Sequence, residues 1–136
     1  KDVEALLLVA PAPDFTTDLL WPRLPEEARR AIEETGAWRA PSQYVDTGAI
    51  YTKKLIEDGA KHRVLDKSID FKGPVHILHG QQDPDVPWQR SLALSGLIAH
   101  DNVVLTLLKD GDHRLSRPRD LLRLCRMAAT LAEQLP

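Results

Sequence analysis

Three short apolar runs, each ending close to a proline or glycine, constrain the fold of this chain more than any other feature of its sequence. The runs occupy residues 3–10, 75–80 and 103–108. Continuous apolar runs of this length are typical of strands that are buried on both faces of a parallel sheet. The sequence therefore predicts three buried strands.

Segments with helical signals separate these runs. Residues 25–34 open with proline and acidic side chains and are followed by Gly36, which is the expected pattern for the start and end of a helix. Residues 51–65, 87–99 and 117–135 are predicted as further helices. The last of these carries an apolar stripe that is expected to face the core. The stripe consists of Leu121, Leu124, Cys125, Ala128, Leu131 and Leu135.

The order of the segments is strand, a largely helical stretch of about 60 residues, strand, helix, strand, helix. Such alternation predicts an α/β fold in which parallel strands are covered by helices. A sheet of so few strands leaves the first one, at residues 5–10, as an uncovered edge. We therefore expect the chain to be part of a longer protein, and the absence of an initiator methionine agrees with this expectation.

Charge and cysteine content exclude several classes of protein. Lys and Arg number 18 and Asp and Glu number 20, so the net charge of −2 argues against a nucleic-acid binder that neutralises phosphates. No apolar run reaches the roughly 18 residues that a membrane helix needs, and no signal peptide is recognisable. A single cysteine rules out an intramolecular disulfide and favours a reducing compartment, namely the cytoplasm or, in a eukaryote, the mitochondrial matrix.

Two polar loops follow the second and third predicted strands. Residues 79–88 and 109–116 contain Asp83 and His113. The carboxyl ends of parallel strands are where open α/β sheets place their ligands and catalytic groups. An aspartate that accepts a hydrogen bond from one imidazole nitrogen leaves the other nitrogen free to act as a general base. The two loops therefore predict a functional Asp–His pair.

Other assignments of these aspartates stay open from the residues alone. Asp85, Asp110 and Asp112 are alternative partners for His113, although Asp83 comes soonest after its strand. Asp83 and Asp85 also suit a purely structural role, because they can cap the helix that begins near residue 87. The acidic residues lack the ligand spacing of a calcium loop, so no metal site is predicted.

Two further reactive side chains are assigned structural roles. His79, at the end of the second strand, is predicted to be a hydrogen-bonded residue beneath the site. Cys125 is predicted to pack in the core on the last helix and is not expected to act as a nucleophile.

The order and spacing of the two loops resemble the C-terminal half of an α/β-hydrolase. In that superfamily a serine nucleophile is followed along the chain by an aspartate or glutamate and then by a histidine. Asp83 corresponds to the acid after the penultimate core strand, and His113 corresponds to the base after the last one. The resemblance implies an α/β-hydrolase fold, a catalytic role for these two residues, and no metal or organic cofactor.

Three stretches narrow the resemblance to the mitochondrial α/β-hydrolase-domain protein ten subgroup, known as acyl-protein thioesterases and acyl-glucuronide esterases. They are residues 36–44 (GAWRAPSQY), 79–88 (HGQQDPDVPW) and 112–114 (DHR). This similarity implies a hydrolase whose partner is a small-molecule ester or thioester with an apolar acyl group.

The nucleophile motif of the superfamily, Gly-x-Ser-x-Gly, does not occur in this chain. None of the serines has the preceding strand and following helix that the nucleophile turn requires. These serines are Ser42, Ser68, Ser91, Ser95 and Ser116. We therefore expect the serine to lie upstream, in an N-terminal part of the same enzyme, and we expect the chain alone to be inactive.

The resemblance also implies how the chain is organised. Residues 1–13 correspond to a core strand and its loop, and residues 73–136 correspond to the C-terminal core with the acid and histidine loops. Residues 14–72 lie where this superfamily inserts a cap over the active site.

Aromatic side chains in the expected cap suit an apolar acyl pocket. Phe15, Trp21 and Trp38 are predicted to contact the substrate, and the alternative is that they only pack the cap onto the sheet.

Two other functions remain open at this stage. The same fold works with an aspartate nucleophile in dehalogenase-like members and with a cysteine in lactone-hydrolase-like members. A non-catalytic module that pairs its exposed first strand with another chain is the third interpretation.

Overall fold

The computed structural model describes residues 3–41 and 48–135. The chain forms two compact units. The sheet unit consists of Lys1–Pro13 and Leu65–Pro136, and the inserted unit consists of Asp14–Val64. Each unit is described by itself below.

The sheet unit contains three parallel strands in the order β1-β4-β5. Strand β1 spans Leu6–Val9, β4 spans Val75–Gly80 and β5 spans Val103–Leu108. Every residue of the central strand β4 is buried, as its uninterrupted apolar run predicts. The predicted α/β fold with parallel strands is thus confirmed.

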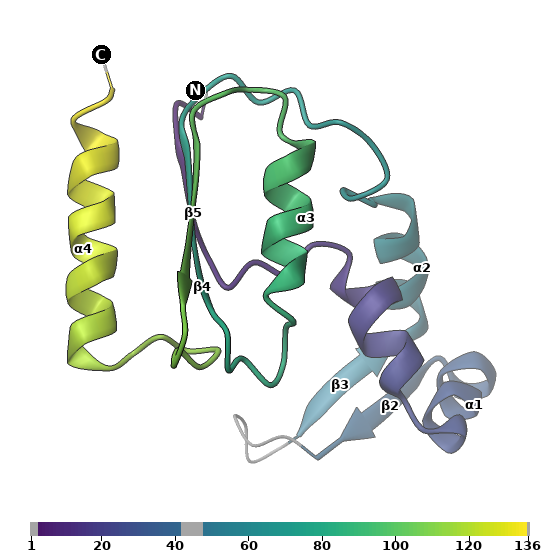
Figure 1. The fold of residues 1–136 in the computed structure, drawn as a ribbon. Helices are drawn as coiled ribbons and strands as arrows, with labels where there is room; N and C mark the ends of the chain where they lie inside the picture. The colour runs from purple at the N-terminus through teal and green to yellow at the C-terminus, as the bar shows by residue number, and fades with distance from the viewer. Residues whose placement is uncertain (1–2, 42–47, 136) are drawn as a thin grey trace. The chain divides into compact units, whose positions relative to one another are not determined.

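Helices α3 (Gln89–Leu97) and α4 (Pro118–Ala132) cover opposite faces of this sheet (Figure 1). Alternate residues of β4 point to opposite faces, so each helix packs on a different set of side chains. On the α3 face, Val75 and Ile77 form a core cluster with Leu94 and Ile98. On the other face a second core cluster, packed against α4, is formed by Leu78, Leu108 and Leu115.

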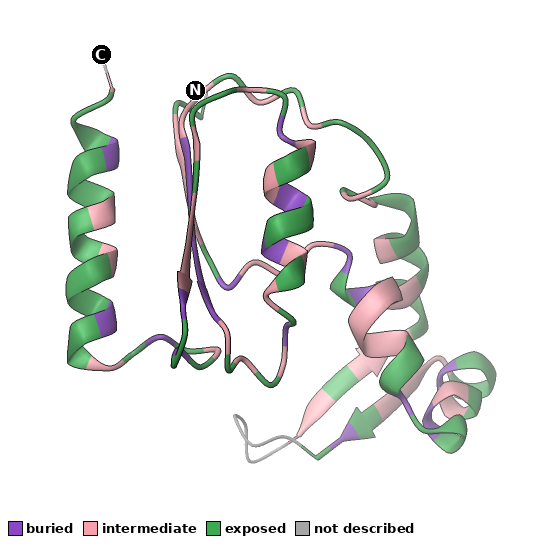
Figure 2. Cartoon of the chain, viewed as in Figure 1, coloured by how far each residue is buried: buried purple, intermediate pink, exposed green. Residues whose placement is uncertain are grey.

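Helix α4 turns a different side to the sheet than its apolar stripe predicts. Leu121, Cys125 and Ala128 are exposed, whereas Leu124 is half-buried and Leu131 is buried. The buried part of α4 forms a narrow strip on its sheet-facing side (Figure 2). The prediction that Cys125 packs in the core is therefore wrong.

An ion pair at the start of α4, with a buried carboxylate and a guanidinium that is 33% exposed, accompanies this orientation. The fully buried carboxylate of Asp120 accepts hydrogen bonds from Arg117 at 2.5 Å and 3.1 Å. The Arg117 guanidinium holds the pKa of Asp120 below its usual value. Because a buried charge must keep its partner, Asp120 faces inwards, and the residues directly beside it on the helix face outwards.

The inserted unit begins with two short helical turns, Thr16–Leu20 and Trp21–Arg23, followed by helix α1 at Glu26–Thr35. Gly36 adopts φ = 86° immediately after α1, a left-handed conformation that glycine adopts at little cost. The predicted helix at residues 25–34 and its glycine stop are confirmed within one residue.

An antiparallel pair of short strands in the inserted unit was not predicted. Strand β2 spans Ala37–Ala40 and pairs with β3 at Ala49–Thr52. Helix α2 then occupies only Lys53–Lys61, where the sequence predicts a helix over residues 51–65. Four-residue strands give too little alternation to be read from sequence, and their pairing depends on cross-strand contacts such as Trp38 on Tyr51.

The segment after the inserted unit belongs to the sheet. Residues 65–72 were assigned to the expected cap, but the inserted unit ends at Val64. Leu65, Ile69 and Phe71 pack against the core cluster on the α3 face, and Ile69 forms an isolated parallel bridge with Ile98.

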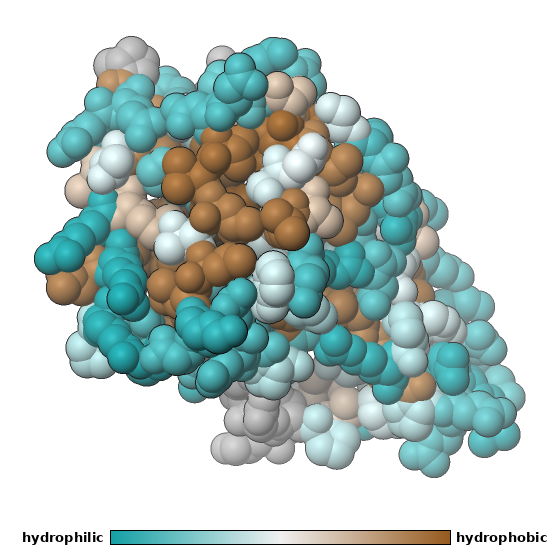
Figure 3. Space-filling model, viewed as in Figure 1, coloured by the Kyte–Doolittle hydropathy of each residue, from teal (hydrophilic) through white to brown (hydrophobic). Residues whose placement is uncertain are grey.

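Large apolar side chains are exposed on the sheet unit. Figure 3 shows apolar surface over the strands and α3 on the face in view. The exposed large hydrophobic residues of this unit are Val3, Val9, Leu92, Val104, Leu121 and Leu122. Within the part of the chain that the structure describes, no helix has the length and apolar character needed to cross a bilayer.

We expect replacement of His76 by leucine to stabilise the fold. His76 is 4% exposed, and neither of its ring nitrogens has a hydrogen-bond partner among the described residues. Because an unsatisfied buried polar group costs about 1–3 kcal/mol, His76→Leu should raise the free energy of unfolding by about 1 kcal/mol or more. Urea denaturation at pH 7 measures this difference. A lower stability of the variant would show that His76 has a partner in solution.

Candidate active site

Two loops meet at the carboxyl ends of β4 and β5, and backbone hydrogen bonds hold them together. The N–H of Gln81 donates to the carbonyl of Leu108 at 2.8 Å, and the N–H of Gln82 donates to the carbonyl of Gly111 at 2.9 Å. These bonds extend the β4–β5 pairing into the loops. The residues that follow Gly80 and Gly111 are therefore brought side by side.

Two glycines make this approach possible. A Cβ atom on Gly80 would lie 2.2 Å from the carbonyl oxygen of Gly111, and a Cβ on Gly111 would lie 2.8 Å from the Cα of Gly80. Any side chain at either position would force the backbones apart. Glycine at both positions is therefore a condition for the contact between the loops.

The structure places Asp83 and His113 in direct contact. Nδ1 of His113 lies 2.8 Å from Oδ2 of Asp83. The Asp83 side chain is fully buried, whereas the His113 side chain is 35% exposed. The pair thus has one end in the protein interior and one end open to a reactant.

All the acceptor positions of the Asp83 carboxylate are used. Oδ1 accepts the backbone N–H groups of Asp85 and Val86, each at 2.8 Å. Oδ2 accepts from His113 and also lies 3.2 Å from Nε2 of His79. Four donors around one carboxylate require that it stay ionised.

Opposing effects set the proton affinity of Asp83. Burial favours the neutral carboxyl and by itself raises the pKa of Asp83. The hydrogen bonds from the Val86 N–H, from His113 and from the Asp85 N–H outweigh burial, so the pKa of Asp83 lies below its ordinary value. The carboxylate is therefore charged at neutral pH.

This geometry fixes which nitrogen of His113 can react. To donate to the carboxylate, Nδ1 must carry a proton, so the neutral ring keeps a lone pair on Nε2. When Nε2 takes up a proton, the ionised Asp83 stabilises the imidazolium that forms. The pair can therefore act as a general base and then as a general acid.

The other candidate carboxylates have different roles. Asp112 accepts the backbone N–H of Leu115 at 2.8 Å and stabilises the turn after His113. Asp110 pairs with Arg117 at 3.2 Å and also with Arg119, and the Arg117 hydrogen bond lowers the pKa of Asp110. Asp83 is hydrogen-bonded to His113, as the order of strand and loop predicts.

A metal centre fits these residues less well than a hydrogen-bonded pair. Asp83, Asp85 and His113 each offer a ligand atom, and these atoms lie within 4.8 Å of one another. However, the acceptor positions of the Asp83 carboxylate are already taken by N–H donors, so a metal would have to displace them. No step of the chemistry below is therefore assigned to a metal.

His79 lies beneath the pair. Its side chain is fully buried, and Nδ1 lies 2.6 Å from Oγ of Ser91 on α3. The expectation of a hydrogen-bonded residue beneath the site agrees with this position. The involvement of Ser91 was missed, because a serine within a helix carries no sequence signal for a contact twelve residues away.

No described serine is arranged as a nucleophile. Ser91 and Ser95 lie within α3, Ser68 bonds the carbonyl of Leu97, and Ser116 follows the histidine loop. Ser42 lies outside the described residues. No hydrogen bond joins His113 to a serine hydroxyl within residues 3–41 and 48–135.

The predicted substrate-contact residues lie in the inserted unit. Trp21 and Trp38 pack against the buried cluster of Leu24, Ala28 and Ile32, and Trp38 also stacks on Tyr51 with ring centroids 6.4 Å apart. Both tryptophans therefore have a packing role, and their contact with substrate stays a prediction.

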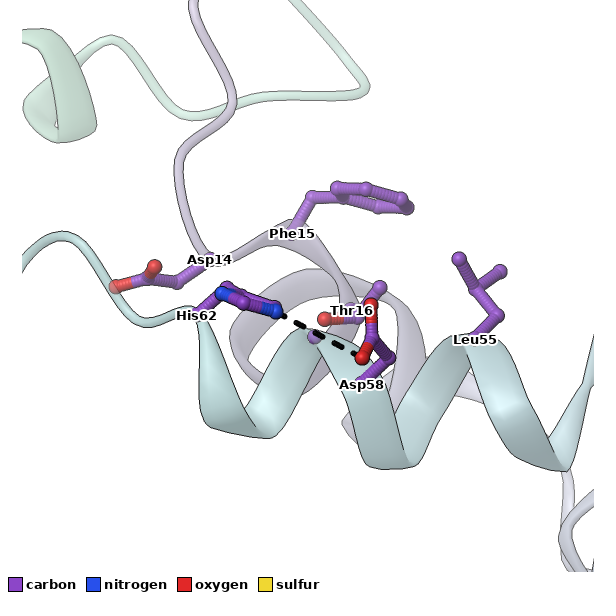
Figure 4. Close-up of a pocket in the computed structure, with 7 residues that line it drawn as sticks. Asp14, Phe15, Thr16, Leu55, Asp58 and His62 are labelled. Carbon is purple, nitrogen blue, oxygen red and sulfur yellow. Dashed lines mark ion pairs between the residues drawn. The ribbon is translucent and has the colours of Figure 1, made fainter.

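Phe15 is more exposed, at 43%, and lines a pocket of about 210 Å³ (Figure 4). Residues of the inserted unit alone form the pocket. In Figure 4 the apolar side chains of Phe15 and Leu55 lie on one side, and the ion pair of Asp58 with His62 lies on another. The pocket is therefore mixed in character.

No protein-family model matches the chain. Curated relatives do match. The mitochondrial palmitoyl-protein thioesterase ABHD10 of Mus musculus is 36% identical over 127 residues, which cover 92% of this chain and 42% of that protein. The Homo sapiens protein of the same name is 31% identical over 122 residues, which cover 89% of this chain and 40% of that protein. The chain thus spans less than half the length of the curated relatives that it matches.

Solved structures match over nearly the whole chain. A protein from Agrobacterium vitis S4 that carries only the general name hydrolase is 45% identical, has a TM-score of 0.89, and is matched over 96% of this chain and 50% of its own. The α/β hydrolase domain-containing protein 10 from mouse is 34% identical and has a TM-score of 0.77. The match covers 98% of this chain and 54% of the mouse protein chain. Est1E from Butyrivibrio proteoclasticus, with ferulic acid bound, matches with a TM-score of 0.69 at 23% identity, which is a likeness of fold alone.

We expect Gly80→Ala to separate the two loops. The added methyl group cannot fit beside the Gly111 carbonyl, so the variant should lose about 1–3 kcal/mol of stability and weaken the Asp83–His113 hydrogen bond. Denaturant unfolding and the NMR signal of the His113 Nδ1–H measure the two effects.

Gly96→Ala is the matched control, because nothing lies within 4 Å of the Cβ position of this glycine in α3. Alanine there should be neutral or stabilising by up to about 1 kcal/mol. If Gly80→Ala were as stable as the parent protein, the proposed role of the glycine contact would be wrong.

The lowered pKa of Asp83 predicts a dependence of stability on pH. A carboxyl whose pKa is lower in the folded protein than in the unfolded one, where it is about 3.9, stabilises the fold above that value. This stabilisation is lost as the pH falls through the folded pKa. The stability difference between the parent protein and Asp83→Asn should therefore be largest near pH 7 and shrink below about pH 4.

Urea denaturation between pH 3 and 7 measures the difference. Asp101→Asn, which removes one exposed negative charge before β5, is the control. A difference for Asp83→Asn that does not change with pH would contradict the expectation.

Proposed function

Because the chain belongs to the α/β-hydrolase superfamily, we propose that it supplies the acid and the base of a serine hydrolase that cleaves carboxylic esters or thioesters. The observation that supports this most directly is the 2.8 Å hydrogen bond between Asp83 and His113 at the carboxyl ends of adjacent parallel strands. The serine is proposed to lie upstream of the chain, as the missing Gly-x-Ser-x-Gly motif indicates.

The proposed reaction has two stages. In the first, Nε2 of His113 accepts the proton of the serine hydroxyl while the serine oxygen attacks the acyl carbon. His113 then donates that proton to the leaving alkoxide or thiolate, and an acyl-serine remains. In the second, His113 takes a proton from water as the water attacks the acyl-serine, and it returns the proton to the serine as the carboxylic acid leaves.

Asp83 is proposed to remain ionised throughout. Its four hydrogen bonds hold it in place, and its charge stabilises the imidazolium that appears in each stage. No metal or organic cofactor is needed for these steps.

The proposed substrate has an apolar acyl group. The curated relatives are named palmitoyl-protein thioesterases, which extends the proposal to long-chain acyl thioesters for this chain. Phe15, Trp21 and Trp38 of the inserted unit are proposed to contact the acyl group, with the inserted unit serving as a cap.

The partner of the chain is proposed to be an N-terminal part of the same enzyme. Within the described residues β1 pairs with β4 on one side only, so its other edge is free to take a further strand. Val9 on this strand is 37% exposed. Without that part we propose that the chain does not hydrolyse substrate, and we propose a reducing compartment, the cytoplasm or a mitochondrial matrix, as its location.

The test uses the longer protein that contains this chain and a fluorophosphonate probe, which labels activated serines. The parent protein should be labelled, whereas His113→Ala and Asp83→Asn should reduce the rate of labelling by at least about a hundredfold. His100→Ala, which removes a histidine just before β5 at the amino end of that strand, is the control and should leave labelling unchanged.

Matched acyl thioesters and oxygen esters of increasing chain length then define the substrate. Failure of the parent protein to react with the probe would contradict a serine nucleophile and would favour an aspartate or cysteine nucleophile or a non-catalytic module. Unchanged labelling of His113→Ala would contradict the role of His113.

A further inference from the structure

A continuous series of hydrogen bonds joins helix α3 to the catalytic pair. Ser91 Oγ lies 2.6 Å from Nδ1 of His79, and Nε2 of His79 lies 3.2 Å from Oδ2 of Asp83. The same oxygen of Asp83 is 2.8 Å from Nδ1 of His113. The side chains of Ser91, His79 and Asp83 are all fully buried. Water therefore cannot replace any of the inner contacts at low cost.

The partners of His79 determine its tautomer. Nε2 faces two acceptors, the Asp83 carboxylate and the carbonyl of Val86 at 3.1 Å, so it must carry a proton. Nδ1 of the neutral ring is then an acceptor, and the Ser91 hydroxyl donates to it. Ser91 thus supplies the donor that the acceptor nitrogen Nδ1 needs in the form of His79 that donates to Asp83.

His79 also restrains the carboxylate. Oδ1 of Asp83 is held by two backbone N–H groups, and Oδ2 receives one imidazole N–H from each side. If the His79 donor were lost, Oδ2 would keep His113 as its one partner, and the carboxyl group could rotate. A rotation of this kind displaces the acceptor on which the orientation of His113 depends.

We propose that His79, held in place by its hydrogen bond to Ser91, is a positioning residue that keeps the Asp83 carboxylate aligned with His113. This rests on the proposed function, since it concerns the same acid–base pair. It goes beyond a purely structural role, in which His79 would only fill the space between β4 and α3.

The main test is Ser91→Ala, because it removes the hydroxyl that holds Nδ1 of His79 and leaves Asp83 and His113 intact. In the longer protein that contains this chain, kcat with a thioester substrate should fall by about ten- to a hundredfold while KM stays within twofold. The downfield NMR signal of the His113 Nδ1–H should weaken or move. Ser91→Thr keeps a hydroxyl and should restore both.

Two matched controls separate positioning from packing. Ser95→Ala removes a hydroxyl of the same helix that donates to the carbonyl of Leu92 and has no other hydrogen bond to the described residues, so it should change neither readout. His79→Phe should lose more activity than Ser91→Ala. His76→Phe, three residues earlier on the same buried strand, has no hydrogen bond to lose among the described residues and should retain activity.

The Ser91→Ala result can support or contradict the positioning role of His79. A Ser91→Ala protein that is less stable but keeps its kcat and its His113 signal would overturn the proposal and leave His79 a packing residue. The NMR readout needs no nucleophile, so it tests the hydrogen-bond series even if the probe experiment excludes a serine hydrolase.

Discussion

The four hydrogen bonds to the buried Asp83 carboxylate are the interactions on which the rest of the site depends. They come from two backbone N–H groups of its own loop, from His79 at the end of β4 and from His113 in the loop after β5. Burial without these donors would neutralise the carboxyl, and a neutral carboxyl could not stabilise an imidazolium. The donors thus decide both where the group lies and whether it carries its charge.

The central strand β4 contributes side chains both to the core and to the candidate site. Its alternating side chains serve both faces of the sheet: Ile77 and His79 point to α3, and Leu78 points to α4. The strand ends at Gly80, where a side chain would collide with the loop after β5. A strand buried on both faces cannot shift its register without exposing one apolar set, so the position of the loop that carries Asp83 is fixed by the core.

Sequence patterns predicted the elements of the sheet unit well, because each pattern reports a local property. Proline, glycine and continuous apolar runs mark where strands and helices begin and end, and the structure places β4 and β5 at the expected residues. The short pair β2–β3 and the orientation of α4 were not predicted. Both depend on partners distant in sequence or on an ion pair with a buried carboxylate, as between Asp120 and Arg117, which hydrophobic periodicity does not register.

The candidate site was likewise only partly predictable from the sequence. Local patterns alone predict that an aspartate and a histidine follow successive parallel strands, since strand and loop positions can be read from the run of residues. That Asp83 hydrogen-bonds His113, and that His79 and Ser91 continue the series of hydrogen bonds, is seen only in the folded chain. The reason is physical: a hydrogen bond depends on distances of a few tenths of an ångström between side chains, and these distances are set by packing of the whole unit rather than by spacing along the chain.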